Sequence, residues 1–190
     1  MKLCEIAEIT AGQIMTRVTD DKIVDGPKST VLTTKAVDDG FINPADLKEV
    51  VLVKSVDPER YTQRGDVMLK LSTPYDAAYI NEEFEGLVIP SFFVAIRPKN
   101  NVDHRYLTAL INSKFFRQQI QVVQTGVGRP MVRISDIRNV EIPDIPLHEM
   151  VVLGDEYELS CQKRKLLKEM EETERELMES RVLKSARRTN

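Results

Sequence analysis

Residues 148–187 read HEMVVLGDEYELSCQKRKLLKEMEETERELMESRVLKSAR, and this stretch sets the architecture expected of the chain. It contains no Pro and a single Gly, Gly154, and it is rich in Glu, Lys, Arg, Leu and Met, which are strong helix formers. A helix over 149–186 would be about 57 Å long at ~1.5 Å per residue. A small domain cannot cover a helix of that length, so we expect this helix to project from the domain or to pair.

The same stretch carries a heptad pattern of apolar residues. Steps of three and four residues connect its members, with Glu156 and Lys163 as polar interruptions. Pairing with a partner helix, parallel or antiparallel, would cover this seam, whereas a long surface helix lying across its own domain would leave it exposed. The members of the predicted seam are Val152, Leu159, Leu166, Met170, Thr173 and Leu177.

Length and composition describe an ordinary globular protein. The chain has 190 residues, of which 42% are hydrophobic and 30% charged, and this composition argues against wholesale disorder. No apolar run approaches the roughly 20 residues that a membrane helix needs, and the acidic N-terminus does not fit a secretory signal, so a cytoplasmic location is expected. Cys4 and Cys161 are too few and too far apart for a disulfide framework.

Charge is distributed unevenly along the chain. The net charge of −3 and the pI of about 5.6 would not by themselves suggest a nucleic-acid binder. Between residues 97 and 138, however, eight Lys or Arg residues stand against Asp103 and Asp136, a local net charge of +6. This segment predicts either a basic surface or a set of cations on unrelated faces, because clustering in sequence does not establish clustering in space.

The remainder of the chain predicts an α+β fold, in which a domain over residues 1–148 with a mixed β-sheet precedes the long helix of 149–190. Apolar residues at helical spacing predict a helix or helix pair over 104–123. We also expect a short strand at 132–134 and a helical turn capped by Ser135 and Asp136. The predicted strands are 30–37, 49–56, 67–71, 87–89 and 92–96.

Known catalytic motifs are missing from the sequence. There is no phosphate-binding loop, no dinucleotide-binding G-x-G-x-x-G, no G-x-S-x-G nucleophile turn and no zinc-ligand spacing around the isolated His104 and His148. Thr73-Pro74-Tyr75 is only weakly similar to the N-P-P-Y motif of amino methyltransferases. We therefore expect no catalytic residues, no metal and no cofactor, and treat the chain as a non-enzyme.

Several motifs, taken in order, resemble the DNA-specificity subunit of type I restriction-modification systems. Each is weak alone, but their order covers almost the whole chain. The motifs are Lys2-Leu3-x-Glu5-Ile6-Ala7-Glu8-Ile9-x-Ala11-Gly12, Thr33-Thr34-Lys35, Gly65-Asp66-Val67-Met68-Leu69-Lys70, the strand from Ser91 to Lys99, Tyr106-Leu107 through Asn112-Ser113, and the block from Gly126 to Glu149 with Ile134-Ser135, Ile142-Pro143 and Pro146-Leu147.

The resemblance implies a function and a form. Full members of that family have two target recognition domains and two long helices, whereas this chain carries one of each and has no internal repeat. The resemblance implies a half-length subunit that reads half of a bipartite site on double-stranded DNA. It further implies a homodimer, or pairing with another specificity half, and recruitment of a methyltransferase subunit and a restriction subunit that perform the chemistry.

Residue type and position suggest the DNA contacts. Arginine suits phosphate or guanine, and polar loops after strands can reach base edges. The predicted DNA-binding residues are Thr33, Thr34, Lys35, Lys70, Ser72, Thr73, Tyr75, Arg129 and Arg133. A different function class stays open, namely a coiled-coil interaction adaptor or regulator without DNA readout, which the long helix and the acidic pI would also fit.

Overall fold

The computed structural model describes residues 1–20, 22–23, 25–122 and 132–187 of the chain. Its centre is a four-stranded sheet in the order β1-β8-β6-β7, in which every neighbouring pair is antiparallel. The parallel component of the fold is limited to two isolated bridges, Gln13 to Pro90 and Val31 to Val88. The sheet strands are β1 (Ala7–Ala11), β6 (Val67–Lys70), β7 (Ala77–Tyr79) and β8 (Phe93–Pro98).

Both faces of the sheet are covered, which explains why β6 is buried at all four positions. Val67 and Leu69 belong to a core shared with the helices, whereas Met68 points into a second core on the other face, as strand alternation requires. The helices on the first face are α1 (Leu3–Ile6), α2 (His104–Asn112), α3 (Lys114–Val122), α4 (Ile134–Arg138) and the start of α5 (Leu147–Arg187).

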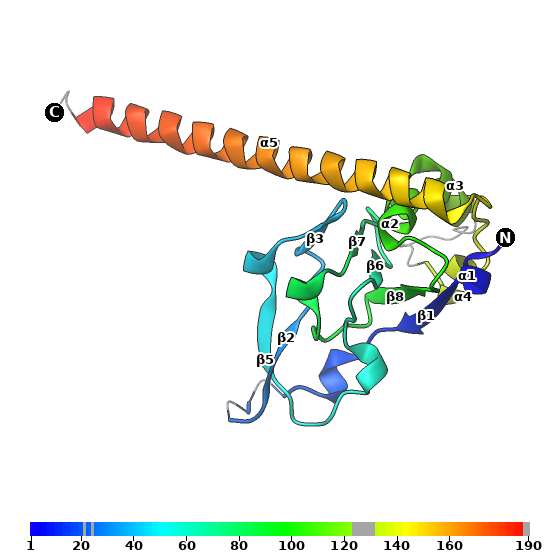
Figure 1. The fold of residues 1–190 in the computed structure, drawn as a ribbon. Coiled ribbons are helices and arrows are strands. Elements are labelled where there is room, and N and C mark those ends of the chain that lie inside the picture. The colour runs from blue at the N-terminus through cyan, green and yellow to red at the C-terminus, as the bar shows by residue number, and fades with distance from the viewer. Residues whose placement is uncertain (21, 24, 123–131, 188–190) are drawn as a thin grey trace.

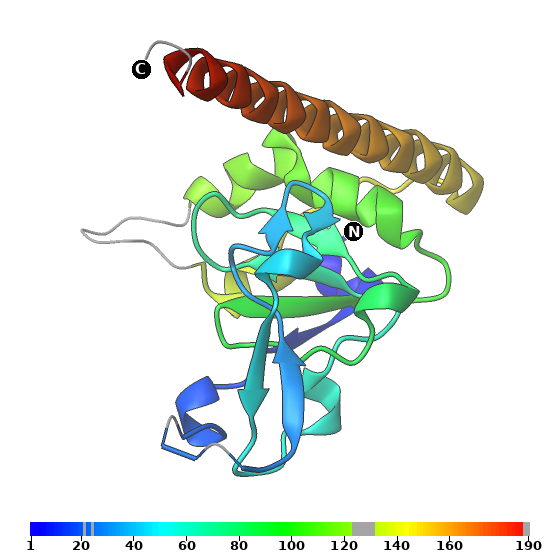
Figure 2. The same ribbon diagram turned by 90° about the vertical axis from the view of Figure 1, so that its left-hand side faces the viewer.

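The second face is covered by short elements. A β3–β4 hairpin packs beside β7, and the β2–β5 ribbon extends away from the sheet with a small core of its own (Figures 1 and 2). Four single 3-10 turns connect the segments. These elements are β2 (Lys28–Val31), β3 (Val37–Asp38), β4 (Phe41–Ile42), β5 (Lys48–Val51), η1 (Met15–Arg17), η2 (Pro44–Asp46), η3 (Pro58–Arg60) and η4 (Glu82–Phe84).

Helix α5 docks on α2 through the charges around Arg105. The Arg105 guanidinium contacts three carboxylates, those of Asp103, Asp155 and Glu158, the last at 3.1 Å. Glu158 also accepts a hydrogen bond of 2.8 Å from the Tyr79 hydroxyl, so β7, α2 and α5 meet at one carboxylate. Burial raises the pKa of Asp103, but hydrogen bonds from Arg105 and from the Tyr106 amide outweigh it and hold that pKa below its ordinary value.

Two further contacts fix the register of this docking. The Asn112 side chain bonds to both the amide and the carbonyl of Ala77, each at 2.8 Å, and donates to the Tyr157 hydroxyl at 2.7 Å. Gly154 packs against the N-cap of α2, where a Cβ would lie 2.5 Å from the Asp103 Oδ1. The only glycine of the helix therefore stands where α5 approaches α2 most closely.

The rest of α5 continues past the domain (Figure 1). Met150 and Cys161 are 4% exposed against the domain, and Lys168, paired with Asp38 at 3.0 Å, is the last residue with a described contact to it. Beyond Lys168, every side chain described as far as Lys184 is exposed. The helix thus combines both arrangements expected from the sequence, since its first part lies across the domain and its second part projects.

The fold class is confirmed, and several local predictions need correction. The long helix begins at Leu147, and the predicted 104–123 helix is a pair that breaks at Ser113. The strand predicted at 132–134 is wrong, because Ile134 begins α4 and only Val132 bonds to the sheet region, through Leu71. Ser135 and Asp136 lie inside α4 rather than capping it, since Arg133 occupies the N-cap position.

We predict that Gly154→Ala destabilises the protein. Overpacking costs about 1–3 kcal/mol and Ala gains ~1 kcal/mol over Gly in a helix, so the free energy of unfolding should fall by up to about 2 kcal/mol. Urea denaturation measures the change, and Ser180→Ala on the projecting part is the matched control, which should leave stability unchanged. A G154A variant more stable than the parent would contradict the docking described here.

Candidate nucleic-acid interface

Four loops converge at the end of the sheet where β1 and β6 finish and β8 begins. The Leu71 amide donates to the Phe92 carbonyl at 2.9 Å, and the Leu71 carbonyl accepts from Val132 at 3.0 Å. The Gly12 amide donates to the Phe93 carbonyl at 3.3 Å. Segments 12–14, 71–73, 91–92 and 132–133 therefore form one surface, which we call the loop surface.

The loop surface contains three of the residues that the sequence predicts for DNA binding. Thr73 and Arg133 are exposed, and Ser72 is partly exposed. Arg133 stands at the start of α4, and no described residue pairs with its guanidinium, so its positive charge is available to an incoming anion. Arg129 lies outside the described residues, so its predicted role stays a prediction.

Lys70 and Tyr75 do not fit the predicted role of direct DNA contact, because the structure buries both. The Lys70 Nζ lies 3.0 Å from the Asp76 Oδ2, and both side chains are under 10% exposed. Asp76 is also 3.3 Å from the partly exposed Arg117, so the buried Lys70–Asp76 pair has a third charge beside it. Tyr75 is 3% exposed within the helix-side core, and its backbone has a left-handed φ of 61°.

Thr33, Thr34 and Lys35 belong to a different surface. The Thr33 hydroxyl donates to the Asp46 carbonyl at 2.7 Å, and the exposed Lys35 ammonium pairs with the Asp46 carboxylate. Together with α5 residues such as Lys168, this part of the chain lines a cavity of about 450 Å³. Among the described residues, no contact joins this group to the loop surface.

Within the described part of the basic segment 97–138, three of the cations are used internally, in ion pairs. Arg97 pairs with the buried Asp66 at 3.0 Å, and Arg105 and Arg117 form the ion pairs already described. Burial raises the pKa of Asp66 above its ordinary value, although the Gln63 amide and Arg97 oppose that shift. These three cations are therefore not available as a free basic surface.

Sequence reasoning missed two apolar side chains at the loop surface. Phe92 is 43% exposed and Ile14 is 40% exposed, although the neighbouring Phe93 is fully buried. Apolar side chains at a DNA interface can contact the methyl group of thymine. The signal that would have found Phe92 is the Phe92-Phe93 pair at a strand start, since alternation sends two adjacent side chains to opposite sides.

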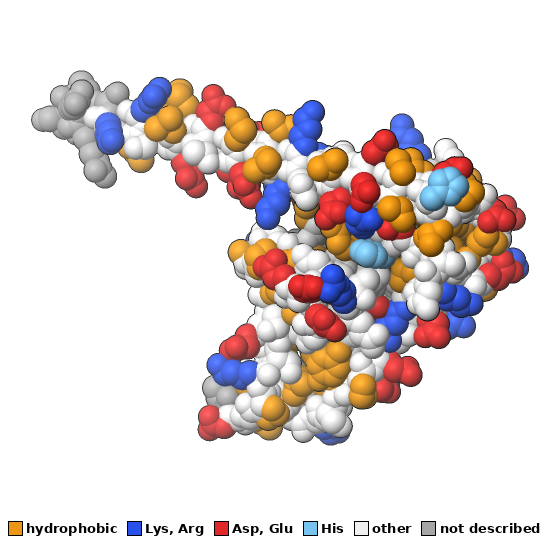
Figure 3. Space-filling model, viewed as in Figure 1, with side chains coloured by type: hydrophobic (Ala, Val, Ile, Leu, Met, Phe, Trp, Pro, Cys, Tyr) orange, Lys and Arg blue, Asp and Glu red, His pale blue; other side chains and the backbone are white. Residues whose placement is uncertain are grey.

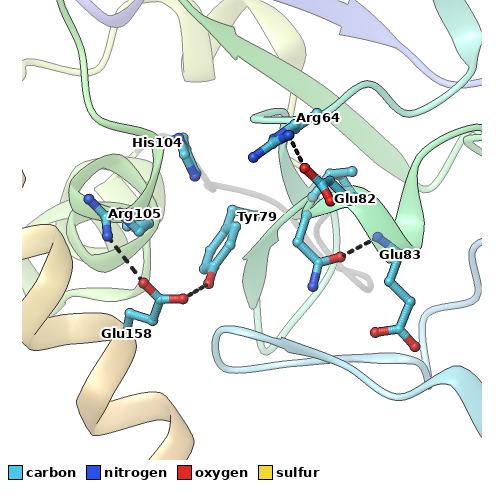
Figure 4. Close-up of a pocket in the computed structure, with 9 residues that line it drawn as sticks. Arg64, Tyr79, Glu82, Glu83, His104, Arg105 and Glu158 are labelled. Atoms are coloured by element: carbon cyan, nitrogen blue, oxygen red, sulfur yellow. Dashed lines mark hydrogen bonds and ion pairs between the residues drawn. The ribbon is translucent and has the colours of Figure 1, made fainter.

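A cavity of about 530 Å³ lies between α2, α5, β7 and η4 (Figure 4). Arg64 pairs with Glu82, and Glu158 pairs with Arg105 and Tyr79, so most of the charges in this cavity already have partners. Burial raises the pKa of Tyr79, as does its bond to Glu158, and burial lowers the pKa of His104. The Tyr79 and His104 rings lie with their centroids 5.1 Å apart. The cavity therefore belongs to the contact between α2, α5 and β7.

No model of a protein family and no curated protein sequence matches this chain. Solved structures do match it. The chain superimposes on a structure of an assembled type I restriction-modification system with a TM-score of 0.65 at 20% identity, and on the HsdS subunit from Thermoanaerobacter tengcongensis with 0.64 at 20%. It superimposes on the type I S subunit from M. genitalium with 0.56 at 13% identity.

The fold is that of the type I S subunits. These matches cover 87–89% of this chain but only 40–43% of the solved chains, so the chain spans less than half the length of the S subunits it resembles. Within the described part of the chain, no three His, Cys, Asp or Glu side chains gather as a metal site, and no helix has both the length and the apolar composition that a bilayer requires.

We predict that Lys70→Met destabilises the fold, because Asp76 would keep only the more distant Arg117 as its cation. Removing one partner of a buried ion pair costs about 3 kcal/mol, whereas Ser72→Ala, in the adjacent and more exposed position, should change stability by less than about 0.5 kcal/mol. The free energy of unfolding in urea measures both. A K70M variant as stable as the parent would contradict the structural role assigned to Lys70.

Proposed function

We propose that this chain is a DNA-specificity subunit of the type I restriction-modification class, with one recognition domain that reads half of a bipartite site. The observation that carries the proposal is the likeness in fold to the S subunits. It covers 87–89% of this chain but only 40–43% of each solved chain. The domain of residues 1–148 supplies DNA contacts, and residues 149–190 supply the helix that positions a second recognition domain.

Specificity of this kind is a binding function. The chain supplies recognition, and separate methyltransferase and restriction subunits, recruited to the complex, supply the chemistry. The loop surface offers Ser72, Thr73 and Arg133 for contact with bases and phosphates, and Thr34 and Lys35 form a second contact group beside α5. Positively charged side chains at these places add affinity through phosphates, and the polar loop adds discrimination between bases.

The second recognition domain comes from a second copy of the chain, paired through α5. At about 100° per residue, the docked positions 150, 154, 157, 161, 164 and 168 lie on one face of the helix, and the predicted seam lies about 180° away. Val152, Leu159, Leu166, Met170 and Leu177 are each at least 50% exposed. Docking on the domain therefore leaves the seam available along the whole helix, and hydrophobic side chains are visible along its projecting part (Figure 3).

One observation favours the adaptor as the second candidate function. The internal ion pairs of Arg97, Arg105 and Arg117 remove much of the basic surface that DNA binding would use, while the exposed seam remains. If the chain is an adaptor, it dimerises through α5. Substitutions at the loop surface then change neither restriction nor DNA binding. Measurement of DNA binding by an Arg133→Glu variant separates these functions, because both of them include pairing through α5.

We predict that the chain is a dimer and that the double variant Leu166→Glu with Leu177→Glu is a monomer, because four glutamates would enter the paired seam. Light scattering at high micromolar concentration measures the mass. Val182→Glu is a control of the same chemistry on the side of the helix away from the seam, and it should leave the dimer intact. A parent protein that is monomeric at that concentration would rule out pairing of two copies.

We predict that Arg133→Glu weakens binding to duplex DNA by at least tenfold, because it replaces a phosphate-binding or guanine-binding cation by an anion. Fluorescence anisotropy with random bipartite duplexes, with and without the methyltransferase subunit, gives the affinity. Arg181→Glu on the projecting helix makes the same change in net charge and should have little effect. Binding that depends on neither sequence nor salt in any of these mixtures would reject the specificity function.

A further inference from the structure

The cations of the described chain differ in the oxygens to which they donate. Most of the partly or fully buried ones pair with carboxylates, as Lys70 does with Asp76 and Arg97 with Asp66. Within the described residues, four cations donate hydrogen bonds to neutral oxygens alone. They are Lys2 to the Asn139 Oδ1 at 3.2 Å, Lys99 to the Glu5 carbonyl at 2.6 Å, Arg138 to the Ile9 carbonyl at 3.1 Å and Arg60 to the Gln13 Oε1 at 2.7 Å.

These four cations lie along a single segment, residues 2–13, although they come from four distant parts of the sequence. The segment includes β1, which is the edge strand of the sheet and pairs only with β8. Helix α4 carries Arg138 to this edge, and η3 carries Arg60 to the end of the segment, and both elements contact β1. Ile9 and Gln13, which supply the acceptors for Arg138 and Arg60, are four residues apart along this segment.

A neutral acceptor orients a cation without cancelling its charge. An arginine held by one carbonyl keeps other N–H donors and its full charge for an anion, whereas an arginine paired with a carboxylate does not. Arg138 is exposed and Arg60 is partly exposed, so both can reach an incoming ligand.

We infer that the β1 edge is a phosphate-binding surface for the DNA backbone, with Arg60 and Arg138 as its principal contacts. This inference rests on the proposed function and extends it from the loop surface to the edge of the sheet. Arg133, at the start of α4, joins the two surfaces, because α4 begins beside the loop surface and ends at Arg138. The contacts position the duplex and carry no sequence information themselves.

Acidic residues near the edge do not neutralise these arginines directly. The Glu5 carboxylate accepts from the Lys2 amide at 2.7 Å. Glu8 stands opposite Arg97 in the strand register, so by alternation it points to the sheet face opposite Ile9. Asp136 in α4 and Glu59 beside Arg60 also lie nearby, but neither forms an ion pair with a described arginine. The surface would therefore bind phosphates through individually oriented arginine side chains and not through an overall excess of positive charge.

The same hydrogen bonds have a purely structural reading, since Arg138 covers a carbonyl at an exposed sheet edge and edge strands need such protection. The two roles differ in their dependence on charge. A phosphate contact requires a cation and contributes to the salt dependence of DNA binding, whereas edge protection affects folding stability and is indifferent to salt. Replacement of both arginines by Gln, and separately by Lys, therefore distinguishes them.

The experiment measures affinity of the full chain for a random-sequence duplex by fluorescence anisotropy from 50 to 200 mM salt. For Arg60→Gln with Arg138→Gln, the slope of log affinity against log salt should shrink by about 1.8, because each lost phosphate contact removes ~0.9. Over this range the affinity of the variant then falls about 12-fold less than that of the parent. The matched control is Arg181→Gln with Lys184→Gln, which removes the same charge from the projecting helix.

The outcomes separate this inference from the function on which it rests. A reduced slope in R60Q/R138Q, an unchanged slope in the control and a slope restored in R60K/R138K support the phosphate-binding edge. A parent that binds the duplex while R60Q/R138Q keeps the parental slope overturns the edge but not the proposed function. A parent that binds no duplex at any salt overturns both. Thermal unfolding of each variant shows whether a loss of binding reflects a loss of fold.

Discussion

The docking of the first part of α5 on α2 is the constraint on which the other features depend. Arg105 holds carboxylates from both sides of the joint, Gly154 permits the close approach, and Tyr157 ties the helix through Asn112 to the sheet. Because these contacts occupy one face of α5, the opposite face is left for a partner, and the direction in which the projecting part leaves the domain is fixed. A flexible linker at this place would fix neither the free face of the helix nor its direction.

Charge in this protein has two uses, and only the structure separates them. Arg97, Arg105 and Arg117 belong to one basic stretch of sequence, yet each pairs with an acid from another segment, namely Asp66, Glu158 and Asp76. Arg60 lies outside that stretch and stands in an acidic half of the chain, yet its partner is the neutral amide of Gln13. Ion pairs between distant segments cannot be counted from a net charge, so a sequence total misplaces the available cations.

The sequence was sufficient for features governed by local pattern. The composition of 148–187 predicted α5, β-branched and apolar runs predicted parts of β2, β5, β6 and β8, and the seam positions are exposed as a partner helix would need. It was insufficient where tertiary contacts decide. Polar Lys70 ends an apolar strand, but Asp76 pairs with it inside the core, and Tyr75 is buried with a left-handed backbone. The Phe92-Phe93 pair indicates that one ring faces outward, but which of the two does so depends on the strand register, which one sequence does not contain.

The geometry of α5 explains why a half-length chain is compatible with recognition of a bipartite site. The part beyond Lys168 adds 19 residues, or about 28 Å of helix, and it carries the same seam as the docked part. When two such helices pair, each copy contributes a rigid arm whose base is fixed to its own recognition domain by the Arg105 joint. Under the proposed function, the distance between the two recognition domains is then set by helix length and pairing register, so the spacing of the two half-sites would be a property of the seam and not of the loop surface proposed to contact bases.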